Sequence, residues 1–244
     1  MFTFFHRRKK IVVDCFTTNV QAYEYAPIAS GISSYPDWWK KLPFANPNDL
    51  DFDDIKFRNM KNCYGFTELY KRSFVLPCWH DFRIIVTPND GYRWNSPEET
   101  ASAIEHPSSQ YEGSFRDYYH IKLESPWLFK TNSKVHFLFS EATWHHEDYH
   151  FKIPTAAIEY KVQGGTNINM FLPKRQENYV TFIPLGKPLV YITPMSESRV
   201  EIKTHLISKD EMNKKSVGHS FLGHKSLVSR KTTSESKRCP FGFK

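Results

Sequence analysis

The chain has 244 residues, of which 40% are hydrophobic and 16% aromatic. This length and apolar content are enough for a substantial buried core, which excludes an intrinsically disordered protein. Fifteen prolines and ten glycines indicate many turns, and twenty Phe with thirteen Tyr favour strands over helices. Because no apolar run reaches the roughly 18 residues of a membrane-spanning helix, we expect no membrane span.

The net charge of +7 is concentrated at the two ends of the chain. Residues 1–10 carry +4 and residues 225–244 carry +5, which leaves −2 for everything between them. Basic ends contact nucleic acid, a membrane surface or an acidic partner, although solvated tails are the commoner case. The start, MFTFFHRRKK, places charge after a short apolar group, the reverse of a secretory signal peptide.

The cysteines predict free thiols in a reducing compartment. No two of them form a CxxC pair, which argues against a zinc ribbon or finger. Their number is low for a chain with a large core, so disulfides are not needed for stability. The four positions are Cys15, Cys63, Cys78 and Cys239.

The first two thirds of the chain predict short strands separated by turns. The segment PNDG (residues 88–91) is a strong turn signal, so residues 79–94 are predicted to form a hairpin. Residues 23–34 look irregular, 46–54 look like a loop, and 61–70 suit a short helix or strand. Strands are expected over residues 11–16, 73–77, 79–87, 92–94, 118–123, 127–130 and 135–140, with one or two more within 151–162.

A short surface helix is predicted in YPDWWKKLP, residues 35–43. Pro36 suits a first helical turn, Asp37 favours its positive end, and two lysines favour its negative end. Trp38 and Trp39 then lie on this helix. Adjacent tryptophans serve as a platform for stacking a ligand or, more commonly, clamp a helix onto a core.

Residues 164–202 have the most regular strand pattern in the chain. Two glycines mark a turn, and residues 167–172 then alternate, with Ile168, Met170 and Leu172 on one face. Further strands are predicted over 179–184 and 189–193 and from residue 200 onward. Prolines bound these strands because proline cannot donate to a sheet ladder.

Together these elements predict a mainly β protein, an antiparallel β-sandwich or jelly-roll-like barrel with a few short helices. A two-layer α+β sheet is the alternative. The domain is expected to span residues 11–207, after a basic leader over 1–10. SKDE at residues 208–211 is a capping box that predicts a short helix, followed by an extended basic tail to residue 244.

HEDYH, residues 146–150, matches the HExxH zinc motif. In that motif His146 and His150 share one helix face as zinc ligands, and Glu147 is a general base. The context argues against it, because a short polar window between two predicted strands is a loop. The histidines are then turn and surface residues, and no cofactor is expected.

A second metal hypothesis keeps the ligands and changes the fold. His145, His146, His150 and Glu147 are able to contribute to an iron or zinc site of a cupin-like, oxygenase-type enzyme. Such a site needs a further ligand from a distant strand, and the sequence favours none of the available side chains. Those are His80, Asp81, His120, His136 and His205.

Two weaker binding hypotheses come from polar and basic residues on strands. Asn167 and Asn169 share one strand face. One hypothesis is that they bind a ligand there; the commoner case is that such side-chain amides simply lie on the surface of a sheet. Aromatic residues with basic neighbours, as in YRW (residues 92–94) and KRSF (residues 71–74), suggest stacking on single-stranded nucleic acid. These groups are scattered along the chain, which weakens that hypothesis.

Several segments carry a resemblance to a known group of proteins. YPDWWKKLP, GGTNINMFLP, FIPLGKPLVYITPMSE, CYGFTELYKRSFVLPCWHDF and YHIKLESPWLFKT resemble a group of uncharacterised proteins encoded by tailed bacteriophages, marine cyanophages among them. The resemblance covers most of residues 11–207. It implies a viral setting, in the virion or the host cytoplasm, and it assigns no active-site residue.

The leading hypothesis is therefore a non-enzymatic phage protein. It is either a virion-associated structural component or a protein-binding β module, with other phage proteins or a second copy of itself as partner. The basic ends are suited to contact with nucleic acid. The cupin-like metalloenzyme and the single-stranded nucleic-acid binder are the alternatives.

Overall fold

The computed structural model describes residues 10–44, 59–88, 91–95, 103–106, 115–146 and 149–216. The protein is mainly β with a few short helices, as the sequence predicts. The strands are β1 (Ile11–Thr17), β2 (Ala29–Ser30), β3 (Phe74–Pro77), β4 (Phe82–Thr87), β5 (Gly91–Asn95), β6 (Ala103–His106), β7 (Tyr118–Lys130), β8 (His136–Glu141), β9 (Ala156–Glu159), β10 (Gly165–Pro173), β11 (Tyr179–Ile183), β12 (Pro188–Pro194) and β13 (Val200–Leu206).

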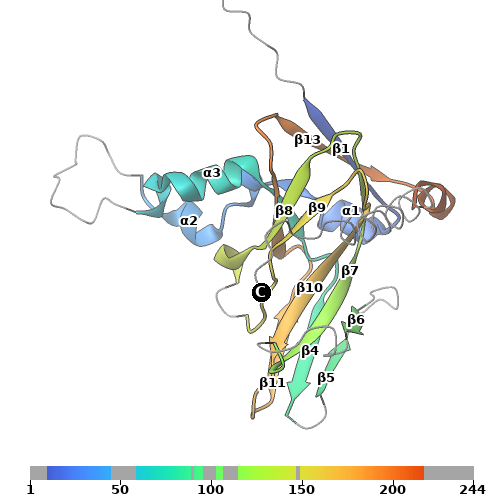
Figure 1. Ribbon diagram of the computed structural model, residues 1–244. Coiled ribbons are helices and arrows are strands. Elements are labelled where there is room, and N and C mark those ends of the chain that lie inside the picture. Colours follow the sequence, from blue (N-terminus) through green and yellow to red (C-terminus); the bar gives the residue numbers. More distant parts are fainter. Residues whose placement is uncertain are drawn as a thin grey trace, which may run out of the picture.

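The helices of the described residues are short. In Figure 1, α2 and α3 lie together on one side of the molecule, away from the long strands β7 and β10. The helices are α1 (Val20–Tyr25), η1 (Gly31–Ser34), α2 (Asp37–Lys41), η4 (Met60–Asn62), α3 (Tyr64–Arg72), η6 (Thr143–His145) and a last helix over residues 209–216. No helix in the described ranges has both the length and the apolar character needed to cross a membrane.

Three sheets make up the β architecture. The β7 sheet has the order β10-β7-β1-β13, with β6 also paired to β7. The β12 sheet has the order β2-β3-β12-β8-β9, and the β4 sheet has the order β11-β4-β5. All pairs are antiparallel except β1 with β13, which bring an early and a late segment of the chain side by side in parallel.

One main core lies where the three sheets face one another. Alternate residues of each strand point into it because successive side chains of a strand lie on opposite faces. β1 has a strictly alternating burial pattern of this kind. The core takes Val13 and Phe129 from the β7 sheet, Ile84 from the β4 sheet, and Leu76 and Ile192 from the β12 sheet. Facing sheets around a shared core agree with the predicted sandwich.

The β12 sheet also has a second buried face, which the helices cover. There Val75 and Tyr191 contact Phe66 and Tyr70 of α3. Neighbouring residues along the same strands, such as Leu76, belong to the main core instead. The helical segment between β2 and β3 therefore covers what would otherwise be an exposed apolar sheet face.

The structure corrects two of the predicted element boundaries. Residues 118–130 form one continuous strand, where two were predicted on either side of Pro126. The pairing of β7 with β10 shifts register between Gly165 and Asn167, opposite this region, and such a bulge accommodates a residue that cannot donate. Helix α1 includes residues 23–25, the start of the segment predicted to be irregular, and the Asn19 side chain caps this helix by accepting a hydrogen bond from the Ala22 amide.

The hairpin and the capping box are confirmed. β4 pairs with β5 across residues 88–91, and Gly91 has a positive φ of 84°, which a glycine adopts without strain. Ser208 Oγ accepts from the Glu211 amide, and the Glu211 carboxylate accepts from the Ser208 amide. The predicted loop over 46–54, the basic tail beyond residue 216 and most of the basic leader lie outside the described residues.

Candidate functional site

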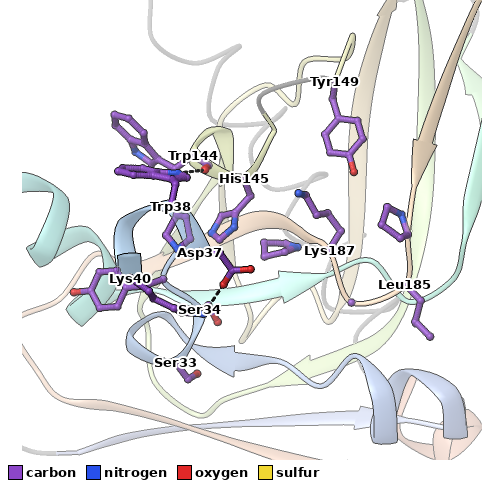
Figure 2. A pocket seen from close by; sticks show the side chains of 15 residues that line it. Ser33, Ser34, Asp37, Trp38, Lys40, Trp144, His145, Tyr149, Leu185 and Lys187 are labelled. Carbon is purple, nitrogen blue, oxygen red and sulfur yellow. Dashed lines mark hydrogen bonds and ion pairs between the residues drawn. The ribbon is translucent and has the colours of Figure 1, made fainter. Parts of the chain in front are cut away.

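A cleft of about 860 Å³ lies where three distant segments of the chain meet (Figure 2). The first segment comprises η1 and α2 and supplies Ser33 and Trp38. The second, around η6, supplies His145, and the third is the turn from β11 to β12, which supplies Lys187. The cleft thus joins the predicted tryptophan helix to the histidine-rich loop, two features that the sequence presents as separate.

A network of stacked rings holds the walls of the cleft in place. Tyr35 stacks between Trp39 and Tyr70, with ring centroids 3.9 Å and 4.4 Å away. Phe66 meets Trp144 edge to face at 5.2 Å. Such pairs add roughly 0.5–1.5 kcal/mol each beyond the apolar area that they bury. The walls are therefore positioned by the same packing that attaches α2 and α3 to the β12 sheet.

His145 belongs both to the cleft and to a buried chain of hydrogen bonds. The Tyr70 hydroxyl lies 2.6 Å from the Tyr191 hydroxyl and 3.2 Å from Nε2 of His145. Within the described chain, the Tyr191 hydroxyl has no other partner, so it donates to Tyr70, and Tyr70 donates to His145. The neutral imidazole then carries its proton on Nδ1, which leaves an N–H donor for a molecule in the cleft.

The central position of Tyr70 in this chain of hydrogen bonds predicts unequal costs for removing the two hydroxyls. Tyr70→Phe leaves the Tyr191 hydroxyl and His145 Nε2 both without a partner, and we expect it to lower the free energy of unfolding by about 2 kcal/mol. Tyr191→Phe removes only the donor at the end of the chain and is expected to cost about 1 kcal/mol. Urea denaturation of both variants measures the difference. An equal or larger loss for Tyr191→Phe would contradict the central position of Tyr70 in this chain of hydrogen bonds.

The surroundings of His145 keep its imidazole neutral at physiological pH. Burial, with like charge from His146 and Lys187 adding to it, lowers the pKa of His145 to about 4. Burial also raises the pKa of Tyr191 to about 12 and raises that of Tyr70, so both hydroxyls stay protonated. The cleft therefore offers an uncharged imidazole, that of His145, beside the ammonium group of Lys187.

A folded-state pKa below that of the unfolded chain makes stability depend on pH. The unfolded chain binds a proton at His145 near pH 6.5 and the folded protein only near pH 4. The contribution to stability is thus complete above pH 6.5 and is lost as pH falls through this window. We expect His145→Asn to lose less unfolding free energy than the unmodified protein between about pH 7.5 and about pH 5. Equal losses in urea denaturation would contradict the assignment.

The described charges of the cleft leave one cation unpaired. Lys40 Nζ lies 3.0 Å from Asp37 Oδ1, an exposed pair that hydrogen bonding keeps ionised by lowering the pKa of Asp37. Lys187 Nζ instead lies over the ring of Tyr149, 5.5 Å from its centroid, with no carboxylate partner among the described residues. With His145 neutral, these side chains favour a ligand that brings a negative charge.

The two predicted tryptophans have different positions. Trp39 is a clamp, because its Nε1 donates to the Met60 carbonyl at 3.1 Å and its ring stacks on Tyr35. Trp38 is also held, with Nε1 donating to the Trp144 carbonyl at 3.1 Å, but it lines the cleft. Figure 2 shows Trp38 and Trp144 side by side at one end of it. Only Trp38 is thus placed to touch a ligand.

The described residues of the HExxH match do not form a metal-binding group. His146 is buried, with Nε2 donating to the Pro188 carbonyl at 2.5 Å and Nδ1 3.5 Å from Glu141 Oε1. His150 is exposed and lies 3.2 Å from the Arg175 guanidinium. Glu147 lies outside the described residues. The metal hypothesis therefore stays a prediction.

The other histidines available as metal ligands have partners elsewhere in the fold. His80 contacts Asn19 and Gln21, and His205 Nε2 lies 2.8 Å from Asp14. His136 is 3.9 Å from Glu159. Across the described ranges, no three His, Cys, Asp or Glu side chains gather as a metal-binding group.

Asn167 and Asn169 lie on the face of β10 that points away from the main core. Asn169 Oδ1 lies 3.0 Å from Nε2 of His120 on the neighbouring strand β7. Asn167 pairs in register with Glu124. These are contacts between adjacent strands, and neither asparagine lines the cleft.

The sequence indicates only part of the cleft. Lys187 stands in a recognisable turn, but nothing in the sequence brings that turn to α2. His145 directly precedes the HExxH match and Tyr149 lies within it, and that match suggests metal chemistry rather than an aromatic wall. The cleft has the size and mixed lining of a ligand site. In comparisons with known proteins, no family model, curated protein or solved structure matches the chain.

Proposed function

We propose that the protein is a non-enzymatic β-rich binding module of a tailed bacteriophage, in the virion or in the infected cell, and that the cleft is its site for a partner protein. The observation that carries the proposal is a cleft of about 860 Å³ whose walls are positioned by buried packing. A site that needs little rearrangement loses little conformational entropy on binding. The resemblance to phage proteins supports the viral setting.

The lining supports a protruding polypeptide segment as the ligand. Trp38 and Trp144 offer aromatic surface, the kind of side chain that supplies most binding energy at protein interfaces. Lys187 is suited to a carboxylate, and the Nδ1–H of His145 is suited to a carbonyl oxygen. The partner segment is thus expected to combine an apolar or aromatic residue with an acidic one.

Site-specific photocrosslinking tests this proposal. A photoreactive amino acid in place of Ser33, which is exposed in the cleft, is introduced into the protein in cells infected by the phage that encodes it. We expect a phage-encoded protein to crosslink from this position and not from Lys161, an exposed residue outside the cleft lining. Lys187→Glu should reduce the crosslink at least tenfold, since it puts a negative charge where an acidic residue is bound; tenfold corresponds to about 1.4 kcal/mol.

Two results would contradict the proposal. One is a crosslinking pattern that is the same from position 33 as from position 161. The other is the absence of the protein from every complex, in purified particles as well as in pull-downs from infected cells. Circular dichroism and a thermal melt of each variant show whether a lost crosslink reflects lost binding or a lost fold.

A further inference from the structure

The outward face of the β4 sheet combines apolar and cationic side chains without any described covering element. Residues of β4, β5 and β11 alternate, so that Phe82, Ile84 and Val86 point into the main core. The residues between them point outward. Those outward residues are Arg83, Ile85 and Thr87 of β4, Arg93 and Asn95 of β5, and Val180 and Phe182 of β11.

The strand register arranges these outward residues in two rows. Phe182 pairs with Arg83, which pairs with Asn95 on its other side. The next row runs from Val180 through Ile85 to Arg93. Directly opposed residues have Cβ atoms about 5 Å apart, so each row is continuous. Val180 is 48% exposed and Phe182 is 50% exposed, which leaves much of both side chains open to a ligand.

The charge of this face is positive within the described structure. Arg83 and Arg93 are exposed, and neither has an ion pair or hydrogen bond to a described side chain. The nearest acidic residue to β4 in the sequence is Asp81, two residues before Arg83. Its Oδ1 already accepts a hydrogen bond from the Leu185 amide at 2.7 Å. Two unpaired guanidinium groups beside an exposed aromatic ring are therefore the chemical signature of the face.

We propose that this face binds single-stranded nucleic acid, with Phe182 stacking on a base and the two arginines contacting phosphates. Guanidinium groups match phosphate oxygens in bidentate geometry, and an exposed ring stacks on any unpaired base. An open sheet face suits an extended strand whose bases are splayed out, as on other β-sheet surfaces that read single strands. A duplex buries its bases and offers Phe182 nothing to stack on.

The aromatic residues that carry the proposal differ from those that the sequence suggests. Tyr92 and Trp94 of the YRW segment pack against the main core, so they are not the stacking residues. Their neighbour Arg93 points outward because of the strand alternation. Phe182, distant in sequence, supplies the exposed ring beside Arg83 in the same row.

Fluorescence anisotropy with the full chain and a labelled 20-nucleotide oligo-dT, measured at several salt concentrations, tests the proposal. We expect Phe182→Ala to weaken binding by roughly 5- to 150-fold, the range measured for loss of one base–aromatic stack. Arg83→Ala with Arg93→Ala should lower the slope of log K against log salt by about 1.4, or about 0.7 for each lost phosphate contact. Phe182→Tyr, which keeps a stacking ring, should retain most of the affinity.

A matched control separates this face from the general charge of the chain. Lys161→Ala with Lys209→Ala removes the same charge from exposed positions outside the β4 sheet and is expected to leave affinity within about twofold. Equal losses in the control and in the arginine pair would overturn the proposal, as would undetectable binding. Competition by poly-glutamate as strong as by unlabelled oligo-dT, or equal affinity for a duplex, would also overturn it. Thermal melts verify that each variant is folded.

Discussion

Replacing Gly31 with alanine is expected to lower the free energy of unfolding by about 3 kcal/mol or more, because the backbone leaves no room for a side chain. A Cβ at this position would lie 2.2 Å from the Tyr70 carbonyl oxygen and 2.8 Å from that of Ser73. Both atoms belong to the backbone at the end of α3, so neither is able to rotate away. The Gly31 amide also donates to the Ser73 carbonyl at 2.8 Å, and that bond holds η1 close.

The same substitution should disturb the cleft. η1 leads directly to Ser33 and Ser34, which line it, and to Tyr35, which stacks under Trp39. A displaced η1 moves this wall relative to Lys187. We therefore expect Gly31→Ala to reduce crosslinking from position 33 even at temperatures where the variant remains folded.

Gly65→Ala is the matched control, with an effect of the opposite sign. Gly65 lies in α3, and a Cβ there would meet no atom within 4 Å. Alanine in place of glycine in a helix stabilises by roughly 0.5–1 kcal/mol. Urea denaturation of both variants gives the comparison. A loss at position 31 no larger than about 0.5 kcal/mol would show that the close approach of η1 to α3 is not required for the fold.

Replacing His146 with alanine is expected to lower the free energy of unfolding by about 3 kcal/mol, through lost packing and lost hydrogen bonds together. Its side chain is 2% exposed and packs edge to face on Tyr149 and Phe151. Its Nε2–H holds the Pro188 carbonyl at the start of β12. Loss of the ring would leave a cavity and an unpaired backbone carbonyl where the loop meets the sheet.

His150→Ala separates this structural role from a metal-binding one. His150 is exposed, so its replacement is expected to change stability by no more than about 0.5 kcal/mol. If both histidines are zinc or iron ligands, the purified protein contains stoichiometric metal, both variants lose it, and a chelator destabilises the unmodified protein. Metal analysis with chelator-dependent melting distinguishes the two roles, and stoichiometric metal that is lost in both variants would overturn the structural assignment of His146.

Local patterns in the sequence determined most of the elements. Alternation in residues 167–172 predicted the burial of Met170, and the turn signal at residues 88–91 predicted the pairing of β4 with β5. The capping box at Ser208 and the short tryptophan helix are also local, because neighbouring residues satisfy each other's backbone groups. Such signals act over a few residues, so they are visible without the fold.

Those local patterns do not predict which strands pair with one another. Nothing local joins β1 to β13 in parallel, and the two strands are separated by most of the chain. The unbroken course of β7 through Pro126 depends on a bulge in β7 itself, where residues 125–127 face a single residue of β10, so the proline alone suggested a break. The register of β11 on β4 likewise decides that Phe182 stands beside Arg83.

The sequence by itself therefore determined a mainly β protein with short helices, basic ends and a conspicuous histidine-rich loop. Only the tertiary structure decided which of these features share a site. His146 became a buried support, while His145, Trp38 and Lys187 came together around one cleft. The physical reason is that hydrophobic periodicity specifies which face of an element is buried, whereas packing between distant elements decides which side chains meet.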